Sequence, residues 1–551
     1  MGLVERRIGL LFAVFLGMIV LAGARAGWLG VVKADSLKSA AATQQKSDIV
    51  VPARRGTITD VNGTELAVSQ PAQTIAATPY LIKDPAATAA KLAKVLRKPE
   101  EGILKQLARR DTGFVYVAHG VPARRAQRVQ DLRIEGLQFI PEYSRDYPRD
   151  WMASQLLGSV GTDGDGLSGL EYMLNKKLKG SDGERKLVKD ALGTPIEMRD
   201  TTPVERGQTV RLTLDAYLQD QAEKVLAEVG KTWQPKGATA IVMDPNSGAI
   251  LALANWPQVN ANALDEAPDY ARRDRAISDT YEPGSTFKAF TVAAALEDKE
   301  VTPDSGFDIP PVLQFSDRQI KDAEDHGYVH MTTRDILKVS SNIGAVLIAK
   351  RVGTQRFDSW IHRFGFGKPT GVDLPGEEQG LVRPLDQYSG STMGNLPIGQ
   401  GLAVTPMQMA AAYSAIANGG ILRAPHIVDA VGGHRKPTPK GKRVISQATA
   451  ASVRSMLEGV LGPGGTASGA AIEGYDLAGK TGTAQKPDPQ GGYSKTKYVA
   501  SFVGFAPAKH PKLLAAVMVD EPNGEIYGGQ VAAPAWKEIM NMALQYLKIS
   551  P

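Results

Sequence analysis

The longest apolar stretch of the chain lies near its start and predicts a membrane-spanning helix. Ile8–Ala24 is an uncharged run between Arg7 and Arg25. A spanning helix needs roughly 17–25 apolar residues, and the run reaches this length, the more so when the long Arg25 side chain extends toward the membrane surface. We therefore expect a retained signal anchor over residues 8–32.

Charged and small residues around this run bear on its orientation and on an alternative. Arg6 and Arg7 precede the run, and positive residues favour the cytoplasmic side, so residues 1–7 are expected to be a cytoplasmic tail. The rest of the chain would then lie outside the cytoplasm. The alternative is a cleaved signal peptide, because Ala24 and Ala26 have the spacing of a cleavage site. Cleavable signals usually have apolar regions of about 7–15 residues, so the longer run favours the anchor.

Beyond the anchor, strand and helix patterns alternate with turn residues. Residues 33–50 are rich in Ala, Ser, Gln and Lys and are expected to form a stalk, with a helix as one option. From 51 to 207 the patterns are short, and an Asn62-Gly63 pair is typical of a β-hairpin. We expect residues 51–207 to form a domain of their own.

A second domain is predicted over residues 208–551, after a boundary marked by Pro203 and Gly207. Its first helix begins after Asp215, a good N-cap residue. The predicted strands are Val210–Leu214, Ala238–Met243, Ala249–Leu253, Tyr498–Phe505 and Leu513–Val519, and the last helix is Ala535–Leu547. Strands at both ends of the domain with helices between them predict an α+β fold, an antiparallel sheet flanked by helices.

Composition excludes several kinds of function. The 551 residues include no Cys, so disulfides, thiolate nucleophiles and zinc–thiolate sites are excluded. Lys and Arg number 64 against 58 Asp and Glu, a net charge of +6 without a long basic block, and nucleic-acid binding is not expected. The seven His show no metal-ligand spacing, and we expect neither a metal nor a cofactor. A catalytic nucleophile would therefore be Ser or Thr.

Ser285 is the candidate nucleophile. Pro283-Gly284 breaks the chain just before an apolar helical pattern, which places Ser285 at a helix N-terminus, where unpaired N–H groups favour negative charge. Lys288 follows one turn later on the same face. Burial and the positive helix end would lower the pKa of Lys288, and a neutral Lys can take the Ser proton.

The spacing of Ser285 and Lys288 is weak evidence by itself, since it recurs. Ser494 and Lys497 repeat it in a predicted polar loop without a helix start, and we expect that copy to be a chance match.

Two further motifs follow Ser285 in order. Ser340 and Asn342 supply a hydroxyl and an amide two residues apart, with a helix cap as the plain alternative. Lys480-Thr481-Gly482-Thr483 lies on a predicted strand, where Gly482 would let a substrate backbone approach and the other side chains can bind a carboxylate; its alternative is an exposed basic turn. The three motifs in this order are typical of penicillin-interacting serine enzymes.

With these motifs the sequence resembles the class B penicillin-binding proteins, the DD-transpeptidases of bacterial peptidoglycan. The resemblance covers nearly the whole chain and implies an anchor, a non-catalytic pedestal of the dimerisation type over 51–207 and a penicillin-binding transpeptidase domain. Arg54–Gly63 and Gly166–Glu171 resemble pedestal motifs, and Gly399–Gly401 resembles one near the active site. Tyr281–Lys288 looks most like the cell-division, FtsI-type branch, with the elongation branch as the nearest rival.

The resemblance implies a role for each motif residue. Ser285 would attack the penultimate D-Ala carbonyl of a stem peptide, Lys288 would act as base and Ser340 would pass a proton to the leaving amine. The implied substrate-binding residues are Asn342, Lys480, Thr481, Gly482 and Thr483. An acceptor amine would resolve the acyl-enzyme into a cross-link, and β-lactams would acylate the same serine.

The resemblance also implies partners and leaves rival functions open. A SEDS-type membrane glycosyltransferase and other division proteins are the expected protein partners. A DD-carboxypeptidase or a β-lactamase would use water in place of the amine, but the anchor and pedestal are unexplained for a small hydrolase. A non-catalytic β-lactam-binding scaffold is disfavoured because all three motifs are intact.

Overall fold

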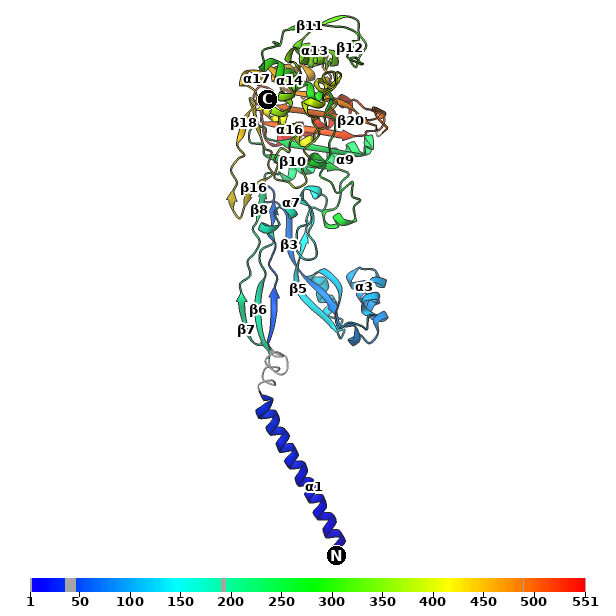
Figure 1. Cartoon of the computed structure of the whole chain (residues 1–551), viewed down its shortest axis with the longest axis vertical. Coiled ribbons are helices and arrows are strands. Elements are labelled where there is room, and N and C mark those ends of the chain that lie inside the picture. Colours follow the sequence, from blue (N-terminus) through cyan, green and yellow to red (C-terminus); the bar gives the residue numbers. More distant parts are fainter. Residues whose placement is uncertain (1, 35–45, 190–194, 489, 551) are drawn as a thin grey trace. The chain divides into compact units, whose positions relative to one another are not determined.

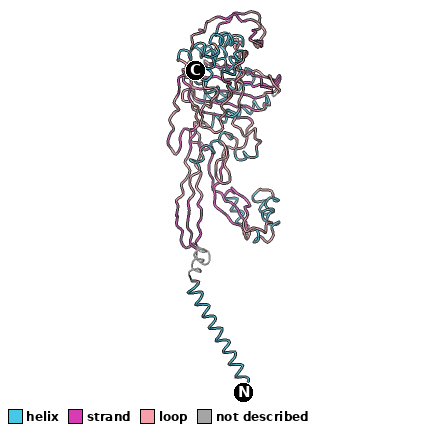
Figure 2. The backbone as a smooth tube through the Cα atoms, viewed as in Figure 1, coloured by secondary structure: helices cyan, strands magenta, loops and turns pink. Residues whose placement is uncertain are grey.

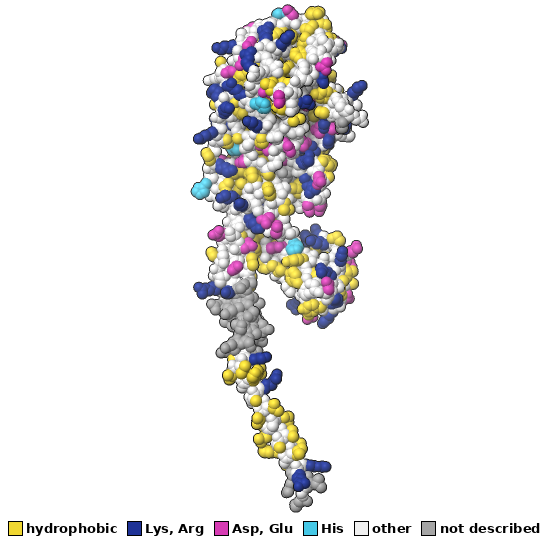
Figure 3. All heavy atoms as spheres, viewed as in Figure 1, with side chains coloured by type: hydrophobic (Ala, Val, Ile, Leu, Met, Phe, Trp, Pro, Cys, Tyr) yellow, Lys and Arg dark blue, Asp and Glu magenta, His cyan; other side chains and the backbone are white. Residues whose placement is uncertain are grey.

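The computed structural model describes residues 2–34, 46–189, 195–488 and 490–550 (Figures 1 and 2). Helix α1 (Gly2–Gly27) continues into a π-helical turn, η1 (Trp28–Val32). Arg6–Val32 has a mean hydropathy of 2.2 and is the only helical stretch of the described ranges long and apolar enough to cross a membrane. Apolar side chains cover its surface (Figure 3). The predicted apolar helix is confirmed, and its length and composition fit a membrane anchor as well as a signal sequence.

The predicted stalk ends in a strand. Lys46–Val51 form β1, which pairs antiparallel with β6 (Gly183–Lys189), and β6 pairs on its other edge with β7 (Pro195–Thr202). A helix option for residues 46–50 is therefore wrong, because pairing with a strand far along the chain decides their conformation. Residues 35–45 lie outside the described residues.

The chain folds into two compact units, each built from separate segments. The first unit holds residues up to Arg54, Pro71–Tyr143 and Gly180–Gly207, and the second holds Arg55–Gln70, Ser144–Lys179 and the chain from Gln208 onward. The sequence-based bounds at 207/208 stay a prediction, because the chain alternates between units before that point.

The first unit has a small α/β body in addition to the β1–β6–β7 sheet. The later part of β3 (Glu65–Ala77) pairs antiparallel with β4 (Val115–Pro122). Ile75, Leu92 and Val117 belong to its aliphatic core. Its helices are α3 (Pro85–Leu96), α4 (Glu100–Leu107) and α5 (Ala123–Gln130), and β5 (Leu137–Asp146) pairs with β3.

The second unit is organised around a five-stranded antiparallel sheet in the order β10-β9-β21-β20-β19. The strands are β9 (Gly237–Met243), β10 (Ile250–Trp256), β19 (Ala478–Pro487), β20 (Tyr493–Ala506) and β21 (Leu513–Asp520). Every residue of β21 is buried, so both faces of the sheet centre are covered. The predicted α+β class and antiparallel sheet are confirmed, with β19 at an edge.

Helices pack around this sheet (Figure 1). Helices α9 (Ala216–Trp233) and α18 (Gly528–Tyr546) contact the sheet and each other, and α16 (Pro406–Ala417) also packs against β21. The remaining main elements near the site are α11 (Lys288–Glu297), α12 (Thr333–Val339), α13 (Asn342–Val352), α14 (Thr354–Arg363), α17 (Gln447–Leu461), β11 (Gly306–Ile309), β12 (Leu313–Phe315), β13 (Arg318–Ile320) and β14 (Val329–Thr332).

The predicted start of α9 is confirmed, whereas the predicted start of α18 is wrong. The Asp215 carboxylate accepts the N–H groups of Tyr217 and Leu218, as expected of an N-cap. The start of α18 at Ala535 is wrong, because the helix begins at Gly528 and runs through Pro534. Pro534 is exposed, so the carbonyl that loses a helical partner lies on the solvent side.

Residues 55–70 and 144–179 join the second unit through buried hydrogen bonds. The N–H of Val210 donates to the Thr57 carbonyl at 2.9 Å, and β2 (Ile58–Thr59) pairs in parallel with β8 (Val210–Leu212). The N–H of Ala153 donates to the Glu223 carboxylate at 2.7 Å. Two segments ahead of residue 207 thus complete the unit that contains the main sheet.

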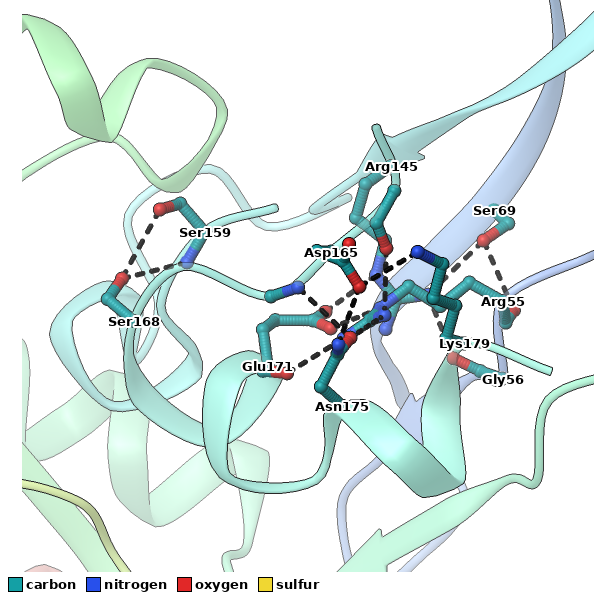
Figure 4. A network of polar contacts seen from close by, with 12 residues as sticks. Arg55, Gly56, Ser69, Arg145, Ser159, Asp165, Ser168, Glu171, Asn175 and Lys179 are labelled. Carbon is teal, nitrogen blue, oxygen red and sulfur yellow. Dashed lines mark hydrogen bonds and ion pairs between the residues drawn. The ribbon is translucent and has the colours of Figure 1, made fainter. Parts of the chain in front are cut away.

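A buried ionic network holds these two segments together (Figure 4). Glu171, which is fully buried, forms 2.6 Å ion pairs with Arg55 and with Arg145. Arg55 also donates to the Asn175 side chain at 2.7 Å, and Arg145 donates to the Gly56 carbonyl at 2.8 Å. The motifs at Arg54–Gly63 and Gly166–Glu171, far apart in sequence, therefore meet at one carboxylate.

Candidate active site

Ser285 lies in a tight helical turn that leads into α11. Gly284–Phe287 form a 3-10 turn, η4, and Lys288 is the first residue of α11. In a 3-10 turn residues three apart lie directly above one another, so Ser285 and Lys288 share a face. Ser285 is half-buried, whereas Lys288 is buried. The expected helix start at the nucleophile is present, in this tighter form.

Lys288 turns toward the second motif. Its ammonium donates to the Ser340 carbonyl at 2.5 Å, to the Ser340 hydroxyl at 3.2 Å and to Asn342 Oδ1 at 2.7 Å. Among the described residues it makes no hydrogen bond to Ser285, a bond that substrate-free sites often leave open. Burial lowers the pKa of Lys288 to about 7, against the opposing charge of Asp322.

The second motif stands between two helices. Ser340 ends α12 in the left-handed region, with φ 62° and ψ 39°, and Asn342 begins α13. The N-cap of α13 is Ser341, whose hydroxyl accepts the N–H of Gly344 at 2.9 Å. The capping alternative therefore applies to Ser341, and the flanking Ser340 and Asn342 face Lys288.

The third motif lies on the edge strand β19. Lys480 is fully buried in the strand, so the exposed-turn alternative is wrong. Its ammonium donates to the Ser340 hydroxyl at 2.9 Å and to Thr481 Oγ1 at 3.2 Å. Burial and the charge of Lys288 hold the pKa of Lys480 well below its ordinary value. The Thr483 hydroxyl accepts the N–H of Gly528 at 3.0 Å and keeps its own proton for donation.

Gly482 allows strand β19 to pack closely against the turn that carries Ser285. A Cβ at this position would lie 2.4 Å from Ser501 Oγ and 2.9 Å from both the Pro283 carbonyl and a methyl of Thr286. The strand and the turn that carries Ser285 can approach closely only because residue 482 has no side chain. Its expected contact with a substrate backbone stays a prediction.

The Gly399–Gly401 loop supports the same turn. The N–H of Gly284 donates to the Gly399 carbonyl at 3.0 Å, and Tyr281 and Val404 exchange two backbone hydrogen bonds. A Cβ on Gly399 would lie 2.1 Å from the Gly284 carbonyl oxygen, and Gly399 has φ +77°. The motif noted from resemblance therefore contacts the candidate nucleophile's turn directly.

Sequence reasoning missed two residues that contact the motifs. Tyr413, on α16, donates its hydroxyl to the Thr286 carbonyl at 2.6 Å. Asp322, in the loop after β13, accepts hydrogen bonds from Ser341 and Asn342. Neither residue lies in a recognisable motif, because its partners are distant along the chain.

The second Ser-x-x-Lys copy, Ser494 and Lys497, lies apart from the three motifs in its hydrogen bonds and ion pairs. Ser494 is in strand β20 rather than in a loop, and its hydroxyl accepts the N–H groups of Thr496 and Lys497. The Lys497 ammonium lies 3.6 Å from the Glu521 carboxylate. No residue of the three motifs is among these partners.

Comparisons with known proteins agree with this geometry. Residues 238–541 match the penicillin-binding protein transpeptidase domain and residues 50–212 match the penicillin-binding protein dimerisation domain. The chain belongs to the penicillin-binding protein transpeptidase family. Its expected likeness to the class B proteins is confirmed by the relatives and solved structures that follow.

Several relatives match over nearly the full length. Stage V sporulation protein D of Bacillus subtilis is 34% identical over 98% of this chain and 86% of its own length. Peptidoglycan D,D-transpeptidase FtsI of Escherichia coli is 33% identical over 98% of this chain and 92% of its own. The crystal structure of penicillin-binding protein 3 from Mycobacterium tuberculosis superposes with a TM-score of 0.72 at 30% identity, over 91% of this chain and 98% of that one.

Proposed function

We propose that this protein is a serine-type D,D-transpeptidase that cross-links peptidoglycan stem peptides through an acyl-enzyme on Ser285. The observation that carries the proposal is the convergence of two buried lysines on one hydroxyl. Lys288 and Lys480 both donate to Ser340, at 3.2 and 2.9 Å. A buried lysine with a lowered pKa is suited to proton transfer, and here two stand beside the turn of the candidate nucleophile.

In the acylation step Ser285 Oγ attacks the carbonyl carbon of the penultimate D-Ala. Neutral Lys288, with a pKa of about 7, takes the hydroxyl proton. As the carbon–nitrogen bond breaks, Ser340 gives its proton to the leaving D-Ala amine and regains one from Lys288. In the second step an acceptor amine attacks the acyl carbon, Ser285 leaves with a proton, and a peptide cross-link forms.

The remaining motif residues bind substrate and developing charge. Thr481 and Thr483 are assigned to the terminal carboxylate, within the positive field of Lys480. Asn342 is assigned to the substrate amide. The backbone N–H groups of Ser285 and Thr483 are assigned to the oxyanion, where loss of one donor typically costs about 10²–10³ in rate.

The proposal extends to the role in the cell. Relatives named FtsI and Stage V sporulation protein D favour septal wall synthesis over elongation. Depletion of the protein is expected to give filamentous cells, and round cells would indicate a role in elongation instead.

Helix α1 is proposed as a single-pass membrane anchor with its N-terminus inside the cell. A SEDS-type glycosyltransferase is proposed as the partner. Protease added outside the membrane is expected to digest the two units.

Labelling with a fluorescent penicillin tests the catalytic assignment. Wild type and Ser494→Ala are expected to label equally, and Ser285→Ala is expected not to label. Full labelling of Ser285→Ala would contradict the proposal. Products formed with and without an acceptor amine then separate a transpeptidase from a carboxypeptidase, since only the former makes the cross-linked product.

A further inference from the structure

Asp322 binds the start of helix α13 at three points. Its side chain is only 8% exposed. Oδ1 accepts the backbone N–H groups of Asn342, at 2.5 Å, and Ile343, at 2.9 Å. Oδ2 accepts the hydroxyl of Ser341 at 2.7 Å. Unpaired N–H groups and the helix dipole both favour an anion at this end of a helix.

The turn that Asp322 holds carries the groups that face Lys288. Asn342 accepts from Lys288 on Oδ1, and its Nδ2 donates at 2.8 Å to the carbonyl of Lys321, the neighbour of Asp322 in the chain. Ser340 accepts from Lys288 and stands two residues before Asn342, in a left-handed conformation. A shift of Asp322 would therefore displace both partners of the lysine.

His326 closes the remaining side of the Asp322 carboxylate. Its Nε2 lies 3.0 Å from Asp322 Oδ2, and its Nδ1 lies 2.6 Å from the Gly327 carbonyl oxygen. A carboxylate and a carbonyl both accept, so both ring nitrogens must donate, which requires the imidazolium form. The bond to Gly327, together with the bond to Asp322 and the charge of Asp325, raises the pKa of His326.

We propose that Asp322 is a positioning residue of the active site, which fixes the start of α13 and so holds Ser340 and Asn342 against Lys288, while His326 holds the carboxylate in place. The inference rests on the proposed function for the reaction that the site performs. Asp322 acts through Asn342 and Ser340.

Asp322 also acts on Lys288 through its charge. Lys288 faces the neutral groups of Ser340 and Asn342, the neighbouring Lys480 side chain and the field of Asp322. The negative charge of Asp322 favours protonated Lys288, so its removal would lower the pKa of Lys288 further. Loss of Asp322 is therefore expected to change both the acylation rate and the pKa of Lys288, whereas loss of an exposed carboxylate without these contacts should change neither.

The experiment measures the second-order rate constant for acylation of the full chain by a fluorescent penicillin, as a function of pH. Asp322→Asn is expected to lose about 100-fold in rate, as misplacement of reacting groups typically does, and its rate–pH midpoint should move to lower pH. Glu324→Gln removes an exposed carboxylate of the same loop, so it is the matched control and should behave as wild type.

An Asp322→Asn protein that folds and acylates at the wild-type rate would overturn the proposal, and so would a rate loss with an unmoved midpoint. Should Asp322→Asn fail to fold, the pH dependence of acylation is measured for His326→Gln instead. His330→Gln, which changes an exposed histidine, is its control. Loss of the imidazolium leaves Asp322 uncompensated, so the midpoint should move to higher pH, and an unmoved midpoint overturns the proposal. Labelling of Ser285→Ala in parallel would instead show that the proposed function has failed.

Discussion

Two lysines beside one serine hydroxyl define the chemistry of this site at the residue scale. Lys288 and Lys480 are both buried, and each has a pKa below its ordinary value, chiefly because of burial. Two ammonium groups so close together repel, so the site favours a state in which one is neutral. Ser340, between them, is placed to pass a proton in either direction.

The pH dependence of acylation follows from Lys288. Its pKa is lowered to about 7, so the neutral, basic form accumulates as the pH rises through that value. We expect the acylation rate constant of the wild type to increase through about pH 7 and then level off, measured with a fluorescent penicillin under single-turnover conditions.

Lys288→Arg is the companion to that experiment. A guanidinium stays protonated across the accessible pH range, so this variant should acylate at least 100-fold more slowly, as expected for loss of a general base. A wild-type rate in Lys288→Arg would assign the base to another group.

Spacing and order in the sequence were enough to predict Ser285, Lys288 and the two later motifs as one site, and the structure brings the last three together by direct hydrogen bonds. Asp322 could not be predicted in this way. The proposed role of Asp322 depends on the contact between its loop and the start of α13, and no local sequence pattern predicts that contact.

At the scale of elements, the site depends on the close approach of a turn, a loop and a strand edge. η4 lies between the Gly399 loop and β19, and glycines at the contacts leave no room for a Cβ. The strands β9 and β10 were predictable from their strong local patterns. The approach of η4 to β19 was not, because it joins segments about 200 residues apart.

Gly399→Ala tests this close approach. The added methyl would meet the Gly284 carbonyl, and alanine would be strained at φ +77°. We expect acylation to fall at least tenfold, because the Ser285 turn must shift. Gly469→Ala, where nothing lies within 4 Å of the new methyl, should match wild type. Equal rates for both variants would show that the turn tolerates the shift.

Glu171 joins two segments of the second unit through the buried ionic network. Its carboxylate forms ion pairs with both Arg55 and Arg145 in a buried position. Glu171→Gln leaves two buried guanidinium groups without their anion, which typically costs about 3–5 kcal/mol. Urea unfolding should show that loss, whereas Asp269→Asn, which breaks an exposed ion pair, should leave stability unchanged. A stable Glu171→Gln protein would mean that the arginines find other acceptors.

At the scale of the whole molecule, helix α1 and the site belong to different compact units. The three motifs and their partners all lie in the second unit, whereas α1 belongs to the first. A chain without residues 2–32 is therefore expected to leave the membrane fraction and to acylate at the wild-type rate. Cell fractionation and penicillin labelling check both outcomes, and loss of labelling in a folded, truncated protein would tie α1 to the site.

Linear sequence reading is weakest at this scale. It predicts contiguous domains, because composition and turn signals are read along the chain. The structure instead assigns residues 55–70 and 144–179 to the second unit, through long-range pairs such as Ala153 with Glu223. Such pairs follow from tertiary packing and leave no periodic signal in the sequence.

The alternation of the chain between its two units also affects which recombinant forms of its gene can encode a stable protein. A recombination event near the codon for Gly207 would transfer residues 208–551 as one block and leave residues 55–70 and 144–179 behind. The recipient's own segments would then have to supply the hydrogen bonds to Val210 and Glu223. Mosaic genes assembled from distant parents are thus expected to yield unstable enzymes even when every catalytic codon is intact.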